Sequence, residues 1–264
     1  MNMKKFPFLM LFLSVMVVSC GLKETKETIA HEDKQAKEMM QGLWVSEGDG
    51  GAAMLVRGDS IFYPDSASMP ARFWIYRDTL FLQGQNVNGY KILKQAPHLL
   101  MFDNQNGDEV KLVKSNSRVL MKSFDYHVYA MNVFRTEQSD TTVFTDLGYY
   151  DCMVSTRTTS GRVVKSTYND NGMEVDNMYL DNVATLTITN HGTLVFRHDF
   201  KKEEFQALVA RDMMQRAILR RFYFDHADRK AFYFNAVIGV PDASTGYVLE
   251  VRVTPDGKIT KRLK

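Results

Sequence analysis

The chain has 264 residues, of which 45% are hydrophobic and 24% are charged, with 16 glycines and 6 prolines. These proportions are typical of globular proteins and exclude collagen, coiled coils and bulk disorder. Lys4 and Lys5 account for the formal charge of +2, because the other 31 of the 33 basic residues equal the 31 acidic residues in number. A neutral remainder lacks the basic surface that binds nucleic acid, so no nucleic-acid partner is expected.

Residues 1–19 have the pattern of a signal peptide. The basic pair is followed by an apolar run from Phe6 to Val18, which is shorter than the roughly 20 apolar residues that span a bilayer. The run ends in Val-Val-Ser-Cys at Cys20, which resembles a bacterial lipobox. The resemblance implies cleavage before Cys20 and attachment of lipid to its thiol, so the first expected partner is a membrane. An ordinary secreted protein is the alternative.

The residue after the lipid-bearing cysteine gives an expectation about location. Many Gram-negative lipoproteins that stay at the inner membrane carry Asp there, whereas this chain carries Gly21. The resemblance therefore implies the outer membrane, with the protein facing the periplasm or the cell surface. Residues 20–40 are rich in mixed charge and poor in apolar side chains, which predicts a lipid anchor and a flexible tether, helical near its end.

From residue 41 to residue 123, short apolar segments alternate with Gly, Asn and Asp turns at intervals of about ten residues. This spacing predicts an antiparallel meander that forms a small barrel or sandwich. The opening Gly42-Leu43-Trp44 followed by a meander resembles the lipocalin-like modules of bacterial lipoproteins.

Residues 124–264 predict a second β-rich domain. Alternating patterns begin at Tyr126–Phe134 and continue to the C-terminus, with a turn at Asn169–Gly172. The only helix expected in this domain runs from Lys202 to Met214, with Asp199 as its cap. The predicted fold class is therefore mainly β with one short helix, a small barrel or sandwich followed by a second antiparallel domain.

The second domain resembles an uncharacterised family of Bacteroidetes outer-membrane lipoproteins. The residues that carry the resemblance are Tyr168–Gly172 and Phe234–Pro241, followed by Asp242-Ala243-Ser244. The family has no assigned activity, so the resemblance implies location and architecture and no catalytic residues.

No motif for catalysis or for a cofactor is present, and we expect neither. With Cys20 used for lipid, Cys152 has no partner for an intrachain disulfide, and its setting predicts a buried strand residue. A metal site at His191 and His198 would need a third ligand, for which Asp199 is the candidate; solvated or turn histidines are the favoured interpretation, so no metal site is predicted. An acidic cluster could bind calcium, but its spacing does not fit an EF-hand; it comprises Asp170, Asn171, Glu174, Asp176 and Asp181.

Four hydroxyl residues follow Asp in a pattern that resembles the O-glycosylation sequon of exported Bacteroidetes proteins. Turn-to-strand junctions also produce Asp-Ser and Asp-Thr pairs, so both interpretations stand. The possible glycosylation sites are Ser60, Ser66, Thr79 and Thr141.

Two uninterrupted aromatic triplets, Phe222–Phe224 and Phe232–Phe234, predict rings on both faces of one sheet. One face would join the core. The other would be covered by another element or would bind a partner, with Tyr223 and Tyr233 as the contact residues.

Together these patterns predict a lipid-anchored, non-enzymatic binding or accessory module of the cell envelope, with either a small ligand or a protein partner. The alternative is a structural subunit of an outer-membrane assembly. A hydrolase built from Cys152 or the scattered carboxylates is the remaining, less favoured interpretation.

Overall fold

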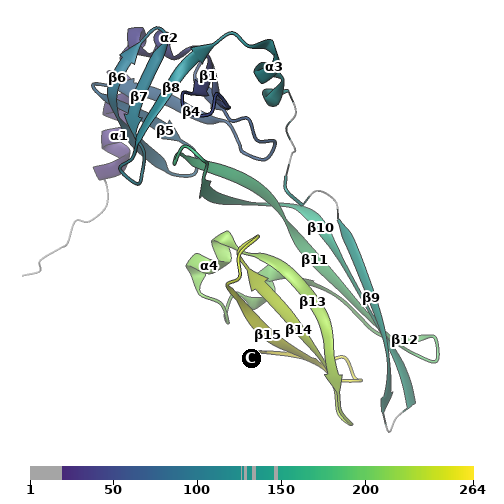
Figure 1. Ribbon diagram of the computed structural model, residues 1–264. Coiled ribbons are helices and arrows are strands. Elements are labelled where there is room, and N and C mark those ends of the chain that lie inside the picture. Colours follow the sequence, from purple (N-terminus) through teal and green to yellow (C-terminus); the bar gives the residue numbers. More distant parts are fainter. Residues whose placement is uncertain (1–19, 126, 128–129, 133–134, 146–147) are drawn as a thin grey trace, which may run out of the picture.

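The computed structural model describes residues 20–125, 127, 130–132, 135–145 and 148–264. Its strands form a closed eight-stranded barrel and two four-stranded antiparallel sheets, which confirms the predicted fold class. Figure 1 shows the barrel at one end, the two sheets at the other, and one long hairpin that joins them. The predicted signal peptide lies outside the described residues. No helix within the described residues is long and apolar enough to cross a membrane.

Residues 20–40, predicted as a tether that is helical near its end, form two helices, α1 (Cys20–Ala30) and α2 (Lys34–Met40). The side chains of Ala36 and Met40 are buried in the barrel core, and the Trp74 indole donates to the Thr28 hydroxyl at 3.1 Å. Asp33 caps α2 by accepting from the Ala36 N–H. A narrow stripe of small and apolar residues, one helical turn apart, is enough to dock this charged segment.

The barrel is an antiparallel meander in which each strand pairs with the next one and β1 pairs with β8. Positive φ at Gly58 and Arg77 marks two of its tight turns, both expected from the sequence. Its strands are β1 (Gly42–Ser46), β2 (Ala52–Arg57), β3 (Ser60–Phe62), β4 (Ala71–Tyr76), β5 (Thr79–Gln83), β6 (Val87–Ala96), β7 (Leu99–Asp103) and β8 (Glu109–Ser115).

Large side chains fill the barrel interior. Trp44, Phe73, Tyr90 and Phe102 are at most 1% exposed, and the Tyr90 and Phe102 rings meet edge to face at 5.9 Å. Eight strands enclose about the space that side chains alone can occupy. The barrel is therefore a packed core.

After the barrel the chain forms α3 (Arg118–Met121) and the 3₁₀ turn η1 (Lys122–Phe124). Phe124 packs against the outside of the barrel. The residue predicted to begin the second domain therefore contacts the first domain. Tyr126–Phe134, predicted as alternating, lies partly outside the described residues, and Met131 and Asn132 form a turn.

The second domain is a sandwich of two sheets, here called sheet B and sheet C. Their inner faces form one core, in which Phe200 stacks on Phe222 at 4.7 Å and Cys152 is buried. Sheet B contains β9 (Thr136–Thr145), β10 (Gly148–Tyr168), β11 (Glu174–Asn190) and β12 (Thr193–Lys201), and sheet C contains β13 (Ile218–Ala227), β14 (Phe232–Gly239), β15 (Gly246–Val253) and β16 (Ile259–Leu263).

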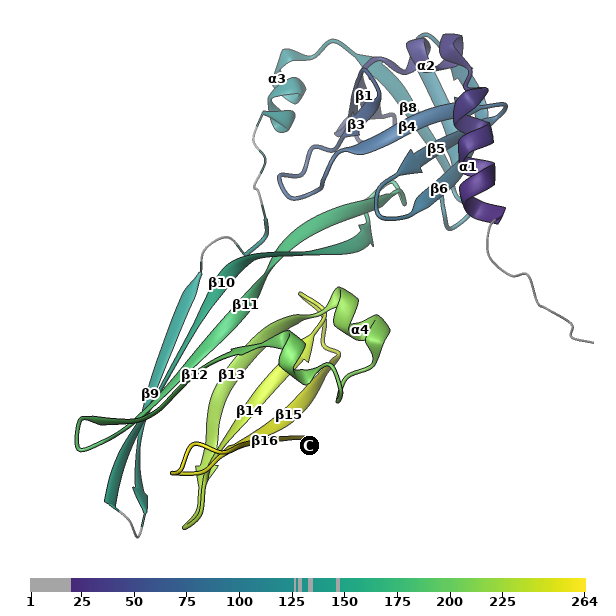
Figure 2. The same ribbon diagram turned by 180° about the vertical axis from the view of Figure 1, so that it is seen from behind.

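The helix predicted at Lys202–Met214 is divided into two short pieces, η2 (Lys202–Phe205) and α4 (Arg211–Arg216). Phe205 and Val209 point into the sandwich core, and burying both is compatible with turns as well as with a helix. Asp199 is not the cap, because it stays in β12 and accepts from the Thr185 hydroxyl at 2.6 Å. Figure 2 shows α4 beside sheet C.

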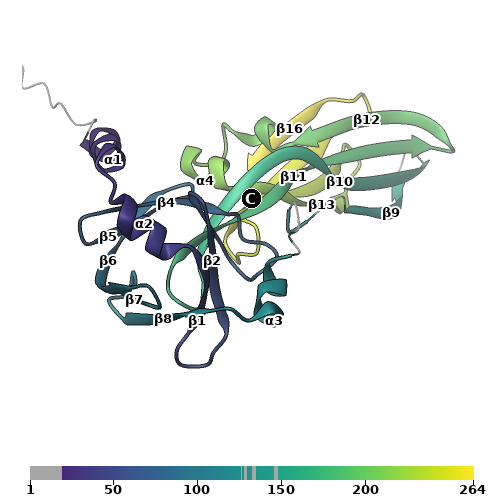
Figure 3. The same cartoon turned by 90° about the horizontal axis from the view of Figure 1, so that it is seen from above.

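Strands β10 and β11 continue past the sandwich as a two-stranded arm. Their register shifts between Thr158 and Arg162, and beyond this bulge neither β9 nor β12 accompanies them. At about 3.3 Å per residue the 21 residues of β10 span about 70 Å. Figure 3 shows both strands crossing from the sandwich to the barrel.

The tip of this arm closes one end of the barrel. Met173, fully buried, and Val175 belong to the barrel core, and the Glu174 N–H donates to the Tyr90 hydroxyl at 2.8 Å. Ser68, from the loop between β3 and β4, pairs with Asn177 in β11. The two domains therefore share one hydrophobic core at their junction.

Candidate functional site

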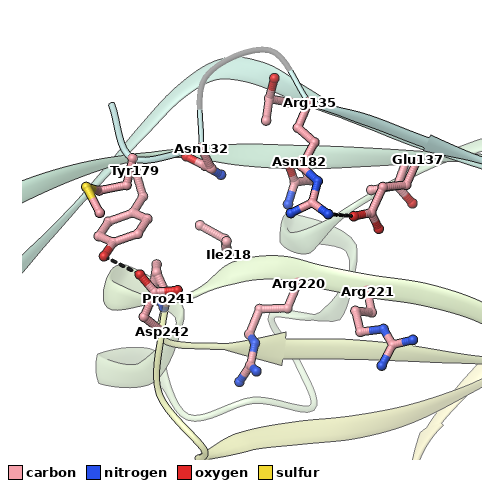
Figure 4. A pocket seen from close by; sticks show the side chains of 13 residues that line it. Asn132, Arg135, Glu137, Tyr179, Asn182, Ile218, Arg220, Arg221, Pro241 and Asp242 are labelled. Atoms are coloured by element: carbon pink, nitrogen blue, oxygen red, sulfur yellow. Dashed lines mark hydrogen bonds and ion pairs between the residues drawn. The ribbon is translucent and has the colours of Figure 1, made fainter. Parts of the chain in front are cut away.

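A cavity of about 870 Å³ lies between sheet C and the part of sheet B next to the arm. We call it the inter-sheet cleft. Figure 4 shows its residues on two sides, with β10 and β11 above and β13 below. Ligand sites in proteins commonly occupy about 300–1,000 Å³, so the cleft has room for a molecule the size of a disaccharide or a short peptide.

Two asparagines on the upper side have fixed side chains. The Asn132 amide donates to the Leu180 carbonyl and accepts from the Leu180 N–H, both at 2.7 Å, in the manner of a neighbouring strand. The Asn182 amide donates to the Leu219 carbonyl at 2.8 Å and so joins sheet B to sheet C. These contacts hold the wall of the cleft in one geometry.

One end of the cleft is closed by the loop between β14 and β15. The Tyr179 hydroxyl donates to the Asp242 carboxylate at 2.6 Å, and Lys165 donates to the carbonyls of Pro241 and Asp242 at 2.8 and 3.2 Å. Burial and the Asp242 carboxylate both raise the pKa of Tyr179, so the hydroxyl stays protonated and remains a donor.

Two consecutive arginines on β13 line the same cleft. Successive residues of a regular strand point to opposite faces. Here Leu219 pairs with Ile238 and Arg221 pairs with Val237, so Arg220 is the extra residue of a β-bulge. A bulge changes the direction of neighbouring side chains, which is why bulges occur beside functional sites.

The guanidinium groups differ in how firmly they are held. Arg220 donates to the Ala243 carbonyl at 2.6 Å, and Arg221 lies over the Tyr223 ring at 5.4 Å. Arg135, from the opposite side, pairs with Glu137 at 2.7 Å, and both of these side chains are more than half exposed. Figure 4 shows the side chains of Arg220 and Arg221 extending from β13 away from Arg135, so these two arginines border the cleft with their backbone while their guanidinium groups lie on the outer side of sheet C.

Thr158 adds a polar group to the wall of the cleft. It is 8% exposed, and its hydroxyl has no hydrogen-bond partner among the described residues. Burying an unpaired hydroxyl costs free energy, so this position is stabilised when something supplies a donor or an acceptor.

Cys152, which the sequence offers as a candidate nucleophile, lies in the sandwich core. Burial raises the pKa of the Cys152 thiol to about 12, and the residue is 1% exposed within the sandwich core, so it cannot act as a nucleophile there. Within the described part of the chain, no group of three or more His, Cys, Asp or Glu residues could hold a metal ion.

The acidic residues that were weighed as a calcium site are engaged within the fold. Asp176 accepts from the Ser166 hydroxyl at 2.6 Å and from the Gln85 N–H. Asp181 accepts from two backbone N–H groups and pairs with Lys202. Both residues are buried. Asp176 joins the arm to the barrel, and Asp181 joins sheet B to sheet C.

The predicted modification sites are dispersed. Cys20 is the first residue of α1, next to the residues that are not described. The four possible glycosylation sites are all half-buried, with one in β3, one in the following loop, one at the start of β5 and one in β9; they are Ser60, Ser66, Thr79 and Thr141. Lipidation and glycosylation stay predictions.

Tyr223 and Tyr233 lie on the outer face of sheet C, and both are half-buried. The Tyr233 ring stacks on His226 at 4.3 Å, and its hydroxyl donates to Asp228 at 3.0 Å. The His226 ring thus covers Tyr233, and the Arg221 guanidinium lies over the Tyr223 ring. The partner role of the two tyrosines remains a prediction.

Sequence reasoning missed the three arginines of the cleft. The pair Arg220-Arg221 inside an apolar strand pattern is a signal of a bulge, since a regular strand would send one arginine into the core. Arg135 has no comparable signal, because it reaches the cleft only through the path of the linker.

The comparison with protein families agrees with the division of the chain. A family model, a domain of unknown function (DUF4738), matches residues 127–261, which include the described parts of the linker, both sheets and every residue that lines the inter-sheet cleft. A search of curated proteins finds no match to the chain. Since the matched residues make up just over half of the sequence, the chain belongs to the DUF4738 family.

Proposed function

We propose that this chain is a non-enzymatic binding or accessory protein of the cell envelope that holds a small ligand in the inter-sheet cleft. One observation carries the proposal. The barrel, the expected container in a lipocalin-like module, is filled by its own side chains, whereas the cleft is a roomy, polar cavity with a fixed wall.

The proposed location is the outer membrane, with lipid on Cys20. This part rests on the sequence: the basic and apolar residues before Cys20, and Gly21 after it. In this arrangement α1 and α2 dock on the barrel, so the barrel would be the part of the protein nearest the membrane. The cleft would then lie farther from the bilayer, open to solutes or partners.

Native mass spectrometry of the protein, extracted gently from its host membrane, tests both parts. The expected spectrum contains a lipidated chain that begins at Cys20 and a second species with one bound small molecule. A bare chain without any bound molecule in any preparation would contradict the binding function.

Two matched variants locate the bound molecule. Thr156 lines the cleft and is half-buried, so Thr156→Trp should fill the cavity and remove the bound mass. Thr193 is exposed at the start of β12, so Thr193→Trp should leave it unchanged. Retention of the molecule by Thr156→Trp would place it elsewhere.

The alternative, a subunit of an envelope assembly, is favoured by one other feature. Phe144, Tyr149 and Leu194 are 70%, 50% and 59% exposed at the hairpin ends of sheet B farthest from the barrel. If this alternative holds, Phe144→Ser should release a co-purifying protein. The double variant Tyr223→Ser and Tyr233→Ser tests, in the same experiment, the outer face of sheet C, where the sequence predicts contact with a partner.

A further inference from the structure

Strand β9 is an unpaired edge of sheet B. It pairs with β10 on one side, and no strand within the described residues pairs with its other side. Figures 1 and 2 show β9 along the outer margin of the sheet. Residues 136–140, Thr142 and Phe144 are exposed. Such an edge presents a row of unpaired N–H and C=O groups, which can pair with another strand.

The other three edges of the sandwich are protected. Proteins protect edge strands with basic side chains, prolines, bulges or short length. β12 has a register shift and carries Arg197 and Lys201, β13 has two register shifts, and β16 has only five residues, which include Lys261 and Arg262. By contrast, the ten residues of β9 pair with β10 without a shift and include no Lys, Arg or Pro. The edge of β9 can therefore accept a further strand.

The side chains of β9 complement those of a second, antiparallel β9. A two-fold axis perpendicular to the sheet keeps the two inner faces together, so each residue lies opposite a residue of the same face. Val143 packs against the sandwich core, which places the odd-numbered residues on the inner face. Pairing centred on Asp140 would oppose two carboxylates, which is unfavourable. Pairing centred on Thr141 spans residues 137–145 and opposes no like charges.

We propose that two copies of this chain associate through β9, antiparallel and centred on Thr141, so that their two B sheets form one continuous sheet. Glu137 then lies opposite Thr145 of the second copy, and Asp140 lies opposite Thr142. Both copies use the same edge, so the association closes at two chains. This inference goes beyond the proposed binding function and does not depend on a ligand.

Sedimentation equilibrium of the whole mature chain tests the association. The chain carries Cys20→Ala, so that neither lipid nor detergent adds mass. The expected result is an equilibrium between one and two chains that shifts towards the dimer as the concentration rises. A single-chain mass at every concentration up to the limit of solubility would overturn the proposal, and so would an open series of larger species.

A cysteine at the centre of β9 tests the register. Opposed residues of antiparallel strands have Cα atoms about 4.5–5.5 Å apart, a distance that a disulfide bridges. Thr141→Cys should therefore give a disulfide-linked dimer under mild oxidation, without interference from Cys152, which is 1% exposed. Thr193→Cys is the control on the β12 edge. Thr193 is exposed and Thr141 is half-buried, so random collisions would link the control more readily. Equal linking of both variants would contradict the proposal.

Opposite charges introduced at one position provide a second test of the register. Thr142 is exposed and lies opposite Asp140 of the second copy in the proposed pairing. Thr142→Glu should weaken the association about fivefold or more, because the symmetric pair then opposes like charges twice, and Thr142→Lys should strengthen it about two- to fivefold. Both variants lose the Thr142 hydrogen bond to Asp151 at 2.8 Å, so this loss cancels in the comparison.

The same two substitutions at Thr193 are the control and should leave the dissociation constant of the dimer unchanged. Equal responses to Thr142→Glu and Thr142→Lys would contradict the register. Release of a different co-purifying protein by Thr142→Glu, from a chain that forms no dimer, would assign the edge to another partner and overturn the proposal.

Discussion

Asp181 is the polar centre at which the two sheets meet. The residue is 7% exposed, and its carboxylate accepts from the N–H groups of Asn182 and Leu219 at 2.8 and 2.9 Å. Lys202 lies 3.3 Å from the same carboxylate. Burial raises the pKa of Asp181, and the Lys202 ammonium and the two N–H donors oppose this rise.

Replacing Lys202 by Met should destabilise the protein by about 3 kcal/mol at neutral pH, because it leaves a buried carboxylate without its countercharge. The folded-state pKa of Asp181 is above the unfolded value, so the penalty develops as pH rises through that pKa and is absent below the unfolded value of about 3.9. Urea unfolding at several pH values measures it.

The neighbouring Lys201 provides the control, since it is exposed. Lys201→Met should change the free energy of unfolding by less than about 0.5 kcal/mol. A loss for Lys202→Met that is equally large at low and neutral pH would show that lost packing, and not the unpaired charge of Asp181, is the cause.

Glu204 gives the protein a second pH dependence, of opposite sign. Burial acts to raise its pKa, but donation from Lys261 at 2.5 Å, from the Lys201 N–H and from His198 lowers it overall. The resulting stabilisation is complete above the unfolded pKa of about 4.3 and is lost as pH falls through the lower folded value.

Glu204→Gln should therefore lower the free energy of unfolding by about 1 kcal/mol at pH 7 and by progressively less in acid. Parallel urea titrations of the wild-type protein and the variant measure the difference. A difference that grows as pH falls would contradict the assignment.

At the scale of elements, the arm of β10 and β11 is the unexpected feature. The turn at Asn169–Gly172 was predicted correctly, as the hydrogen bond from the Gly172 N–H to the Asn169 carbonyl shows. The sequence does not indicate that this turn packs against the barrel. The apolar Met173 would fit the core of a local hairpin equally well.

Removing the Met173 side chain tests this closure of the barrel. Met173→Ala should destabilise the barrel by about 2–5 kcal/mol, because Met173 is fully buried and a cavity would remain. Leu194→Ala is the matched control at another hairpin end, where the side chain is 59% exposed. If the two variants melt alike in calorimetry, the arm does not close the barrel in solution.

Local patterns predicted the barrel meander and most of its turns because strand alternation and turn residues act over a few positions. They were incomplete where packing between residues far apart in the sequence determines the local structure. The helix predicted near the end of the charged segment is present as α2, where Ala36 and Met40 enter the barrel core, but the preceding helix α1 was not predicted. The predicted helix at Lys202–Met214 is divided into η2 and α4, because turns bury Phe205 and Val209 as well as a helix would and the apolar spacing alone does not determine a helix.

At the scale of the whole molecule, the barrel and the sandwich have different roles. The barrel is packed and carries the N-terminal helices, while the sandwich and arm enclose the cleft. The candidate site could not be predicted from the sequence. Its residues come from the linker, the arm, β13 and the loop between β14 and β15, and only the folded chain brings them together.

Amide hydrogen exchange on the host-purified protein, before and after its bound molecule is stripped, tests the central claim most directly. The account predicts slower exchange in the bound form around residues 218–221 and 130–132, which border the cleft, and no change in barrel strands β2 and β4. Protection confined to the barrel strands, with no change at the cleft, would contradict the account.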